Sequence, residues 1–90
     1  MNIPKDIVTP DEKGKIFTTD ANEAADLENI KTQLLQISEI KEVRVNSEVF
    51  PSQIHIFTSQ FLRVTEIQEL VKKTGFHILA TNIFPFEIRN

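Results

Sequence analysis

The chain alternates between two apolar periods, and the order of these periods predicts its secondary structure. Apolar residues at every second position are typical of strands, and apolar residues that recur at every third or fourth position are typical of helices. The period of two occurs at residues 15–19, 42–46, 53–58 and 77–80, and the helical period runs from 20 to 37 and from 61 to 74. The predicted order is therefore strand, helix, strand, strand, helix, strand.

This order predicts an α+β protein with the ferredoxin-like βαββαβ fold. In that fold a four-stranded antiparallel sheet carries both helices on one face and leaves the other face open. We expect the domain to span residues 15–80, after a flexible arm at 1–14, where prolines, a glycine and charges follow no apolar period. An apolar tail follows at 81–90. The strand residues predicted to face the helices are Ile16, Thr18, Val43, Val45, Ile54, Ile56 and Ile78.

Polar residues and a glycine predict where the two helices begin and end. Asp20 and Glu23 have the spacing of a capping box, in which two side chains bind free N–H groups at the start of a helix. Thr65 and Gln68 have the same spacing at the second helix. Gly75 can adopt the left-handed conformation that terminates a helix, so the second helix is predicted to stop just before it.

Composition and charge exclude several classes of function. The 90 residues are 40% apolar and 26% charged, as expected of one folded domain. Ten basic and thirteen acidic residues give a net charge of -3, and we expect no nucleic-acid partner because such proteins bind phosphates with an excess of positive charge. The chain has no cysteine, which removes disulfides, thiolate metal sites and cysteine nucleophiles.

Neither membrane insertion nor enzyme activity is expected. The sequence does not start with a basic segment and an apolar run, and it has no run of about 18 apolar residues, so we predict a cytoplasmic protein. The serines lack the neighbouring glycines of a nucleophile elbow. Gly14 and Gly75 stand alone, so no glycine-rich loop can hold a phosphate.

Residues 16–78 resemble the heavy-metal-associated (HMA) domain, a family of copper chaperones and of modules on metal-pumping ATPases. In that family the first strand leads into a G-M-x-C-x-x-C loop, and apolar residues follow at fixed spacings. With Asp26 at the position of the second cysteine, the matching residues are Ile30, Leu34, Ile37, Ile40, Val43 and Val45, with Gly75 and Phe76 after the second helix. The resemblance implies the same fold, with Glu23 and Asp26 at the two metal-binding positions.

The acidic residues after the first strand have two interpretations. As metal ligands, Asp20, Glu23 and Asp26 would bind a hard divalent ion weakly through oxygen, alone or with ligands from a partner. Carboxylates do not replace thiolates for Cu(I), which prefers soft ligands. As structural residues, the same side chains would cap the first helix and offset the positive end of its dipole. The structural interpretation predicts that no cofactor is bound.

Aromatic residues predict a surface for interaction. The candidates are Phe17, His55 and Phe57 on the open face of the sheet, Phe50 in a loop, and Phe84 and Phe86 in the tail. RNA-binding domains stack bases on aromatic residues of an open sheet, but the acidic charge of this chain argues against that use. We expect a protein partner, a second copy or the tail to cover the open face.

The leading hypothesis is a small HMA-like domain without thiol metal ligands that acts as a protein-interaction module through its open face, loop or tail. The alternative is a metal-binding or metal-delivery protein that uses Asp20, Glu23 and Asp26 or ligands from a partner. Metal-dependent thermal stabilisation would favour the alternative, because a ligand that binds only the folded state raises its stability.

Overall fold

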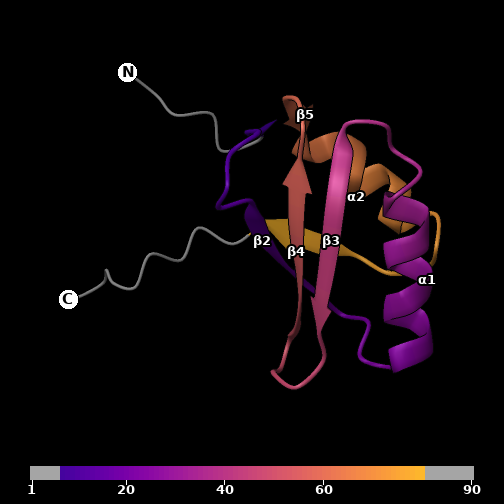
Figure 1. Ribbon diagram of the computed structural model, residues 1–90. Helices are drawn as coiled ribbons and strands as arrows, with labels where there is room; N and C mark the ends of the chain where they lie inside the picture. The colour runs from indigo at the N-terminus through magenta and orange to yellow at the C-terminus, as the bar shows by residue number, and fades with distance from the viewer. Residues whose placement is uncertain (1–6, 81–90) are drawn as a thin grey trace.

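Antiparallel strands and two helices make up the structure, a computed structural model that describes residues 7–80 (Figure 1). The strands are β1 (Ile7–Val8), β2 (Lys15–Thr19), β3 (Ile40–Asn46), β4 (Ser52–Thr58), β5 (Leu62–Arg63) and β6 (Ile78–Ala80), and the helices are α1 (Ala24–Leu34) and α2 (Val64–Lys72). The predicted tail at 81–90, with Phe84 and Phe86, lies outside the described residues.

Four strands form the main sheet in the order β3-β4-β2-β6, and β1 pairs with β5 in a separate two-stranded sheet. Both helices lie on the same side of the main sheet (Figure 1). α1 packs against β3, and α2 packs against β6 and α1. This α+β arrangement is compatible with the predicted ferredoxin-like fold, and no helix within residues 7–80 has the length and apolar character needed to cross a membrane.

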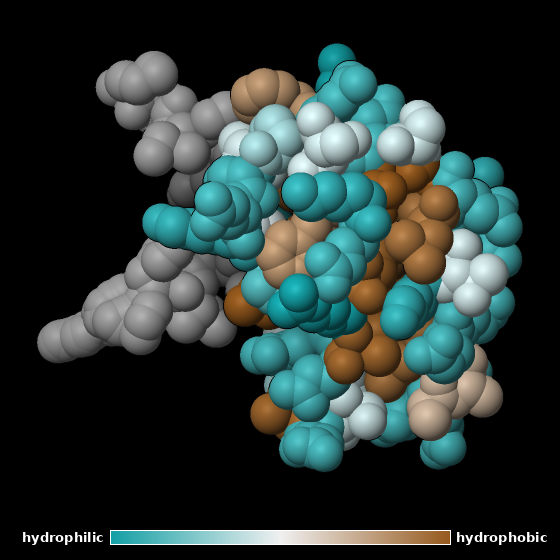
Figure 2. All heavy atoms as spheres, viewed as in Figure 1, coloured by the Kyte–Doolittle hydropathy of each residue, from teal (hydrophilic) through white to brown (hydrophobic). Residues whose placement is uncertain are grey.

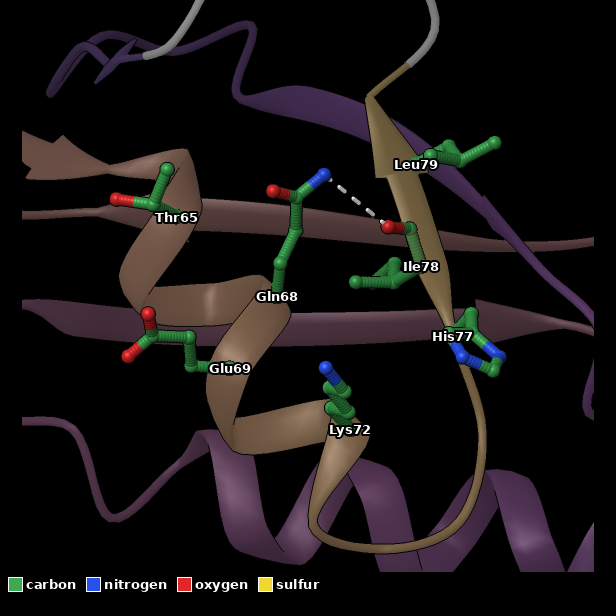
Figure 3. A pocket seen from close by; sticks show the side chains of 7 residues that line it. All are labelled: Thr65, Gln68, Glu69, Lys72, His77, Ile78 and Leu79. Atoms are coloured by element: carbon green, nitrogen blue, oxygen red, sulfur yellow. Dashed lines mark hydrogen bonds between the residues drawn. The ribbon is translucent and has the colours of Figure 1, made fainter.

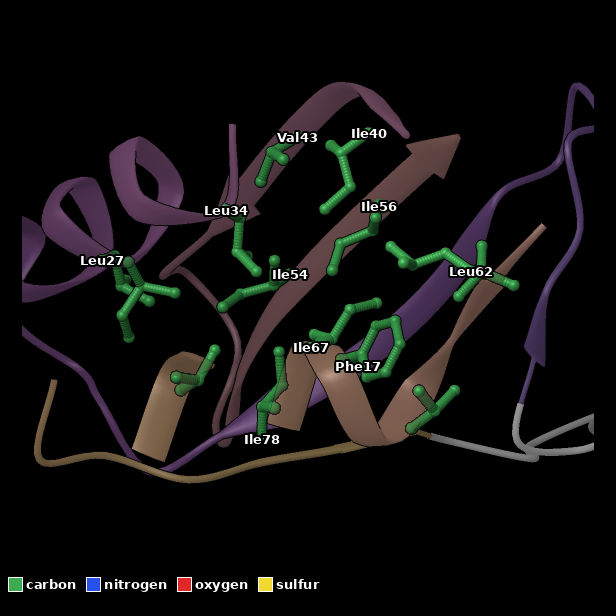
Figure 4. Packing of buried hydrophobic residues seen from close by; sticks show 14 of the residues in the cluster. Phe17, Leu27, Leu34, Ile40, Val43, Ile54, Ile56, Leu62, Ile67 and Ile78 are labelled. Carbon is green, nitrogen blue, oxygen red and sulfur yellow. The ribbon is translucent and has the colours of Figure 1, made fainter. Parts of the chain in front are cut away.

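The core lies between the helices and the main sheet (Figure 4). Its buried side chains include Leu27, Ile30 and Leu34 of α1, Ile67 and Val71 of α2, and Phe17, Val43, Ile54, Ile56 and Ile78 of the sheet. Each such aliphatic side chain stabilises the fold by roughly 1.5–3 kcal/mol when it leaves water. Figure 2 shows apolar surface along the seam between β3 and α1, framed by hydrophilic side chains.

The face predicted for the first strand is wrong. Phe17 lies opposite Ile54 in the β2–β4 pair and is 0% exposed, whereas Ile16 lies opposite His55 and is 37% exposed. Residues directly opposite each other in antiparallel strands point to the same face of the sheet, so Phe17 enters the core and Ile16 and Thr18 face away from it. The segment KIFTT has a large apolar residue on each of its two faces, and the pairing of Phe17 with Ile54 decides which face enters the core.

Part of the segment predicted as a flexible arm belongs to the fold. β1 pairs with β5, and Val8 is buried in the core. Between β1 and β2, the carboxylate of Asp11 accepts hydrogen bonds from the backbone N–H groups of Lys13 and Gly14, at 2.9 and 3.0 Å. A two-residue strand is too short to produce an apolar period, so the pattern of the sequence could not reveal this pairing.

The capping box predicted for α1 is also wrong. Glu23 is the N-cap residue, but its side chain makes no cap hydrogen bond. Asp20 turns toward the other end of the chain, where its carboxylate accepts a hydrogen bond from the backbone N–H of His77. A carboxylate satisfies whichever free N–H group the fold brings closest, and here that group is remote in sequence.

α2 likewise begins without the predicted box of Thr65 and Gln68. Its N-cap residue is Arg63, which makes no side-chain cap hydrogen bond. The side-chain amide of Gln68 instead donates to the backbone carbonyl of Ile78 in β6, at 3.3 Å. Gly75 follows the helix with a φ of 96°, which confirms the predicted glycine at its end.

Candidate functional site

The candidate site surrounds the start of β6, where two remote turns are linked. The backbone N–H of His77 donates to Oδ1 of Asp20 at 2.8 Å, and the ring nitrogen Nδ1 of His77 lies 3.2 Å from Oδ2 of the same carboxylate. The hydroxyl of Thr19 donates to the backbone carbonyl of His77 at 2.7 Å. Three hydrogen bonds therefore hold the β2–α1 turn against the α2–β6 turn.

The hydrogen bonds at this link fix its charge. The backbone N–H of His77 holds the pKa of the Asp20 carboxyl below its ordinary value of 3.8; burial opposes this shift, and the His77 ring adds to it. An ionised carboxylate can only accept hydrogen bonds, so Nδ1 of His77 carries the proton that faces Asp20. At neutral pH the link therefore presents the negative charge of Asp20 beside the His77 ring.

Asp20 is expected to make the free energy of unfolding depend on pH in the acid range. Since its pKa is lower in the folded than in the unfolded state, the carboxylate stabilises the fold above pH about 4, and this contribution is lost as the pH falls through the folded pKa. We expect Asp20→Asn to reduce the pH dependence of the free energy of unfolding below pH about 4, by a small amount because the pair is exposed. Urea unfolding at stepped pH measures the difference.

His77→Ala is the matched variant for this prediction. It removes the ring but keeps the backbone N–H, which is the larger cause of the lowered pKa of Asp20. The acid dependence of stability should therefore largely persist in His77→Ala and shrink in Asp20→Asn. Identical pH profiles for Asp20→Asn and the wild type would contradict the stabilising role of the Asp20 carboxylate.

A hollow of about 450 Å³, which we name the open-face hollow, lies beside this link. Its lining residues are Thr18, Thr19, Asp20, Asn22, Phe50, Pro51, His77 and Leu79. Phe50 of the β3–β4 loop is 88% exposed, and Leu79 of β6 is 63% exposed. Two large apolar side chains from distant parts of the chain therefore meet at a hollow whose rim is polar.

A second hollow, which we name the edge groove, lies on the other side of β6 (Figure 3). Its volume is about 320 Å³, and its lining residues are Thr65, Gln68, Glu69, Lys72, His77, Ile78 and Leu79. In Figure 3 the amide of Gln68 reaches from α2 to the carbonyl of Ile78, and the side chain of Leu79 points away from α2. The start of β6 thus lies between the hollow that Phe50 and Leu79 line and the groove that α2 lines.

The predicted metal residues take different positions around the start of α1. Glu23 precedes α1, and Asp26 lies in its first turn, whereas Asp20 is bound to His77. Among residues 7–80, no three His, Cys, Asp or Glu side chains are grouped so that they could hold a metal ion.

The predicted aromatic surface is only partly present. Phe17 lies in the core, and Phe57 is only 7% exposed although it lies on the open face. The ring of Phe57 stacks on His55 with 4.2 Å between ring centroids, and the guanidinium carbon of Arg44 lies 5.0 Å from its centroid. The backbone at Gly14 approaches the same ring. Of the predicted aromatic residues that the structure describes, only Phe50 presents a largely exposed ring, so the base-stacking platform is not formed.

Sequence reasoning missed Leu79 and the pairing of Asp20 with His77. Leu79 belongs to a short apolar strand, and its register with Thr18 places it on the open face of the sheet. The sequence positions of Asp20 and His77 differ by 57, so no local spacing connects them. The topology supplies the missing signal, because the ferredoxin-like fold places the first and last strands of the sheet side by side.

Comparison with known proteins finds no family model, no curated protein and no solved structure that matches the chain. The chemistry of the site is therefore inferred from the residues of this chain alone. It combines an exposed aromatic ring and an exposed leucine with the carboxylate of Asp20 and the backbone of an edge strand. Exposed apolar side chains and the free backbone of an edge strand are groups that can contact apolar side chains and extended backbone.

Proposed function

We propose that the protein is a small protein-interaction module, with a ferredoxin-like fold of the HMA type and without thiol metal ligands. The fold proposal is supported by the strand order β3-β4-β2-β6 and by the two helices on one side of the sheet. In a βαββαβ chain, this order places the first and third of the four sheet strands at the centre and the other two at the edges.

The exposure of Phe50 at the open-face hollow carries the functional proposal. The ring of Phe50 is 88% exposed, so it contributes little to the stability of the fold. It can bury most of its area against a partner. Leu79 lies on the same hollow and enlarges the apolar surface, while Asp20 and His77 form a polar rim. Apolar anchors surrounded by polar residues are typical of the centre of a protein interface.

A metal-delivery function has less support. Glu23 and Asp26 are part of no group of three possible ligands within residues 7–80, and the Asp20 carboxylate is already used by His77. Catalysis is not part of the proposal either, because neither hollow is lined by a serine or a cysteine that could act as a nucleophile. Recognition of another protein requires only exposed apolar side chains, which Phe50 and Leu79 supply.

The proposal is tested by capturing partners from cells of the organism that encodes the chain. Tagged wild-type protein, Phe50→Ala and Phe61→Ala are compared by quantitative mass spectrometry. Phe61 is the matched control because its ring is 67% exposed but lines a different hollow, beside β5. We expect a defined set of proteins to bind the wild type and Phe61→Ala and to be depleted by about tenfold with Phe50→Ala, as for an interface anchor. Equal capture by both variants would refute the role of Phe50.

A further inference from the structure

The two edges of the main sheet are protected differently. On β3 the edge carries Lys41, Glu42 and Arg44, and its register with β4 is irregular between Ile40 and Glu42. Charges and irregular pairing are two of the devices by which proteins prevent an edge strand from pairing with another chain. β6 reads Ile-Leu-Ala and carries no charge. Within the described residues, β6 is therefore the edge that is open to pairing.

The backbone of β6 shows which groups face outward. The carbonyl of Ile78 accepts a hydrogen bond from Gln68 of α2, so it points away from β2 and into the edge groove. In an antiparallel pair, the N–H and C=O of one residue point to the same side, and successive residues alternate. Leu79 therefore pairs with Thr18 of β2, while Ile78 and Ala80 direct their backbone groups outward.

We propose that β6 pairs with β6 of a second copy of this chain, antiparallel and across a two-fold axis at Leu79. The inference rests on the proposed function, and it identifies a second copy of the chain as the partner that binds at β6. Ile78 of each copy would exchange backbone hydrogen bonds with Ala80 of the other, and the partner strand would replace the Gln68 amide at the Ile78 carbonyl. The two Leu79 side chains would then face each other as a non-hydrogen-bonded pair, which is the closer of the two pair types.

Charge complementarity favours a second copy over an unrelated strand. Glu69 and Lys72 lie about one turn apart on α2, and both line the edge groove. A two-fold axis sets the two α2 helices antiparallel, so that Glu69 of each copy faces Lys72 of the other. The same contact buries Leu79, which is 63% exposed in the single chain. The groove is thus self-complementary in charge and in backbone hydrogen bonding.

Sedimentation velocity on the full chain, from about 10 µM to about 1 mM, tests the pairing. We expect a reversible dimer whose dissociation constant rises by at least about tenfold in Ala80→Pro, because proline removes an outward N–H group. The ladder to β2 does not use this N–H, so the thermal midpoint of the Ala80→Pro monomer should stay close to that of the wild type. Leu79→Lys should weaken the dimer by a similar factor, and Phe61→Ala should leave it unchanged. A monomer at every concentration, or a dimer unaffected by Ala80→Pro and Leu79→Lys, would overturn the inference.

A charge exchange tests the predicted contact between the helices. Glu69→Lys alone brings like charges together and should weaken the dimer, and Glu69→Lys combined with Lys72→Glu should restore it. Failure of the double variant to restore the dimer would overturn the two-fold arrangement. These variants leave Phe50 intact, so a monomer that still captures Phe50-dependent partners would refute the dimer and leave the proposed function standing. If the dimer is weakened by Ala80→Pro but the same proteins are captured by Phe50→Ala as by the wild type, the dimer stands and the proposed role of Phe50 is refuted.

Discussion

Phe17→Ala is expected to lower the free energy of unfolding by about 3–5 kcal/mol, as is typical when a large aromatic side chain is removed from a core. Phe17 is 0% exposed and belongs to the cluster that joins the central strand β2 to both helices. Its loss would leave a cavity beside Ile54 and Ile67, and the neighbouring strands on both sides of β2 restrict how far the structure can relax (Figure 4). Urea unfolding followed by far-UV circular dichroism measures the change.

Phe61→Ala is the control, since its ring is 67% exposed and its removal should change stability by less than about 0.5 kcal/mol. Ile16→Ala provides a second comparison on the same strand and should cost much less than Phe17→Ala, because Ile16 is 37% exposed. If Ile16→Ala proved the more destabilising of the two, the strand would have the face predicted from the sequence, with Phe17 outward.

The sequence is sufficient to locate the strands of the main sheet and the two helices, but it does not show which face of the first strand enters the core. Apolar periods are local, and β2, β3, β4, α2 and β6 each lie within or next to a segment that shows one. Orientation depends on which neighbours a strand meets. In KIFTT, Ile16 and Phe17 compete for the core, and only the pairing of Phe17 with Ile54 resolves the competition.

The candidate site was less predictable because its contacts are remote. The turn-rich loop predicts Phe50 as an interaction residue, and the structure leaves its ring largely exposed. Asp20 was expected to cap a helix, since the spacing to Glu23 is local, but the backbone N–H of His77 takes that carboxylate instead. The edge groove requires α2 to lie beside β6, which no pattern within either element reports.

Gly14→Ala is expected to destabilise the protein by about 2–4 kcal/mol, the sum of a backbone and a contact effect. Gly14 has a φ of 64°, where an alanine is strained by about 1–2 kcal/mol. A Cβ atom at this position would also lie 2.7 Å from the carbonyl oxygen of Ile56 and 2.7 Å from the ring of Phe57. The carbonyl belongs to the central strand β4 and cannot move without disturbing the sheet.

Gly75→Ala separates the two effects. Gly75 also has a positive φ, of 96°, but no other atom lies within 4 Å of the position that a Cβ would take. Its replacement should therefore cost only the backbone strain, about 1–2 kcal/mol, and the additional loss in Gly14→Ala measures how closely the backbone covers Phe57. Equal losses would mean that this cover is loose. A larger loss at Gly14 would show that the segment before β2 packs closely over Phe57 on the open face.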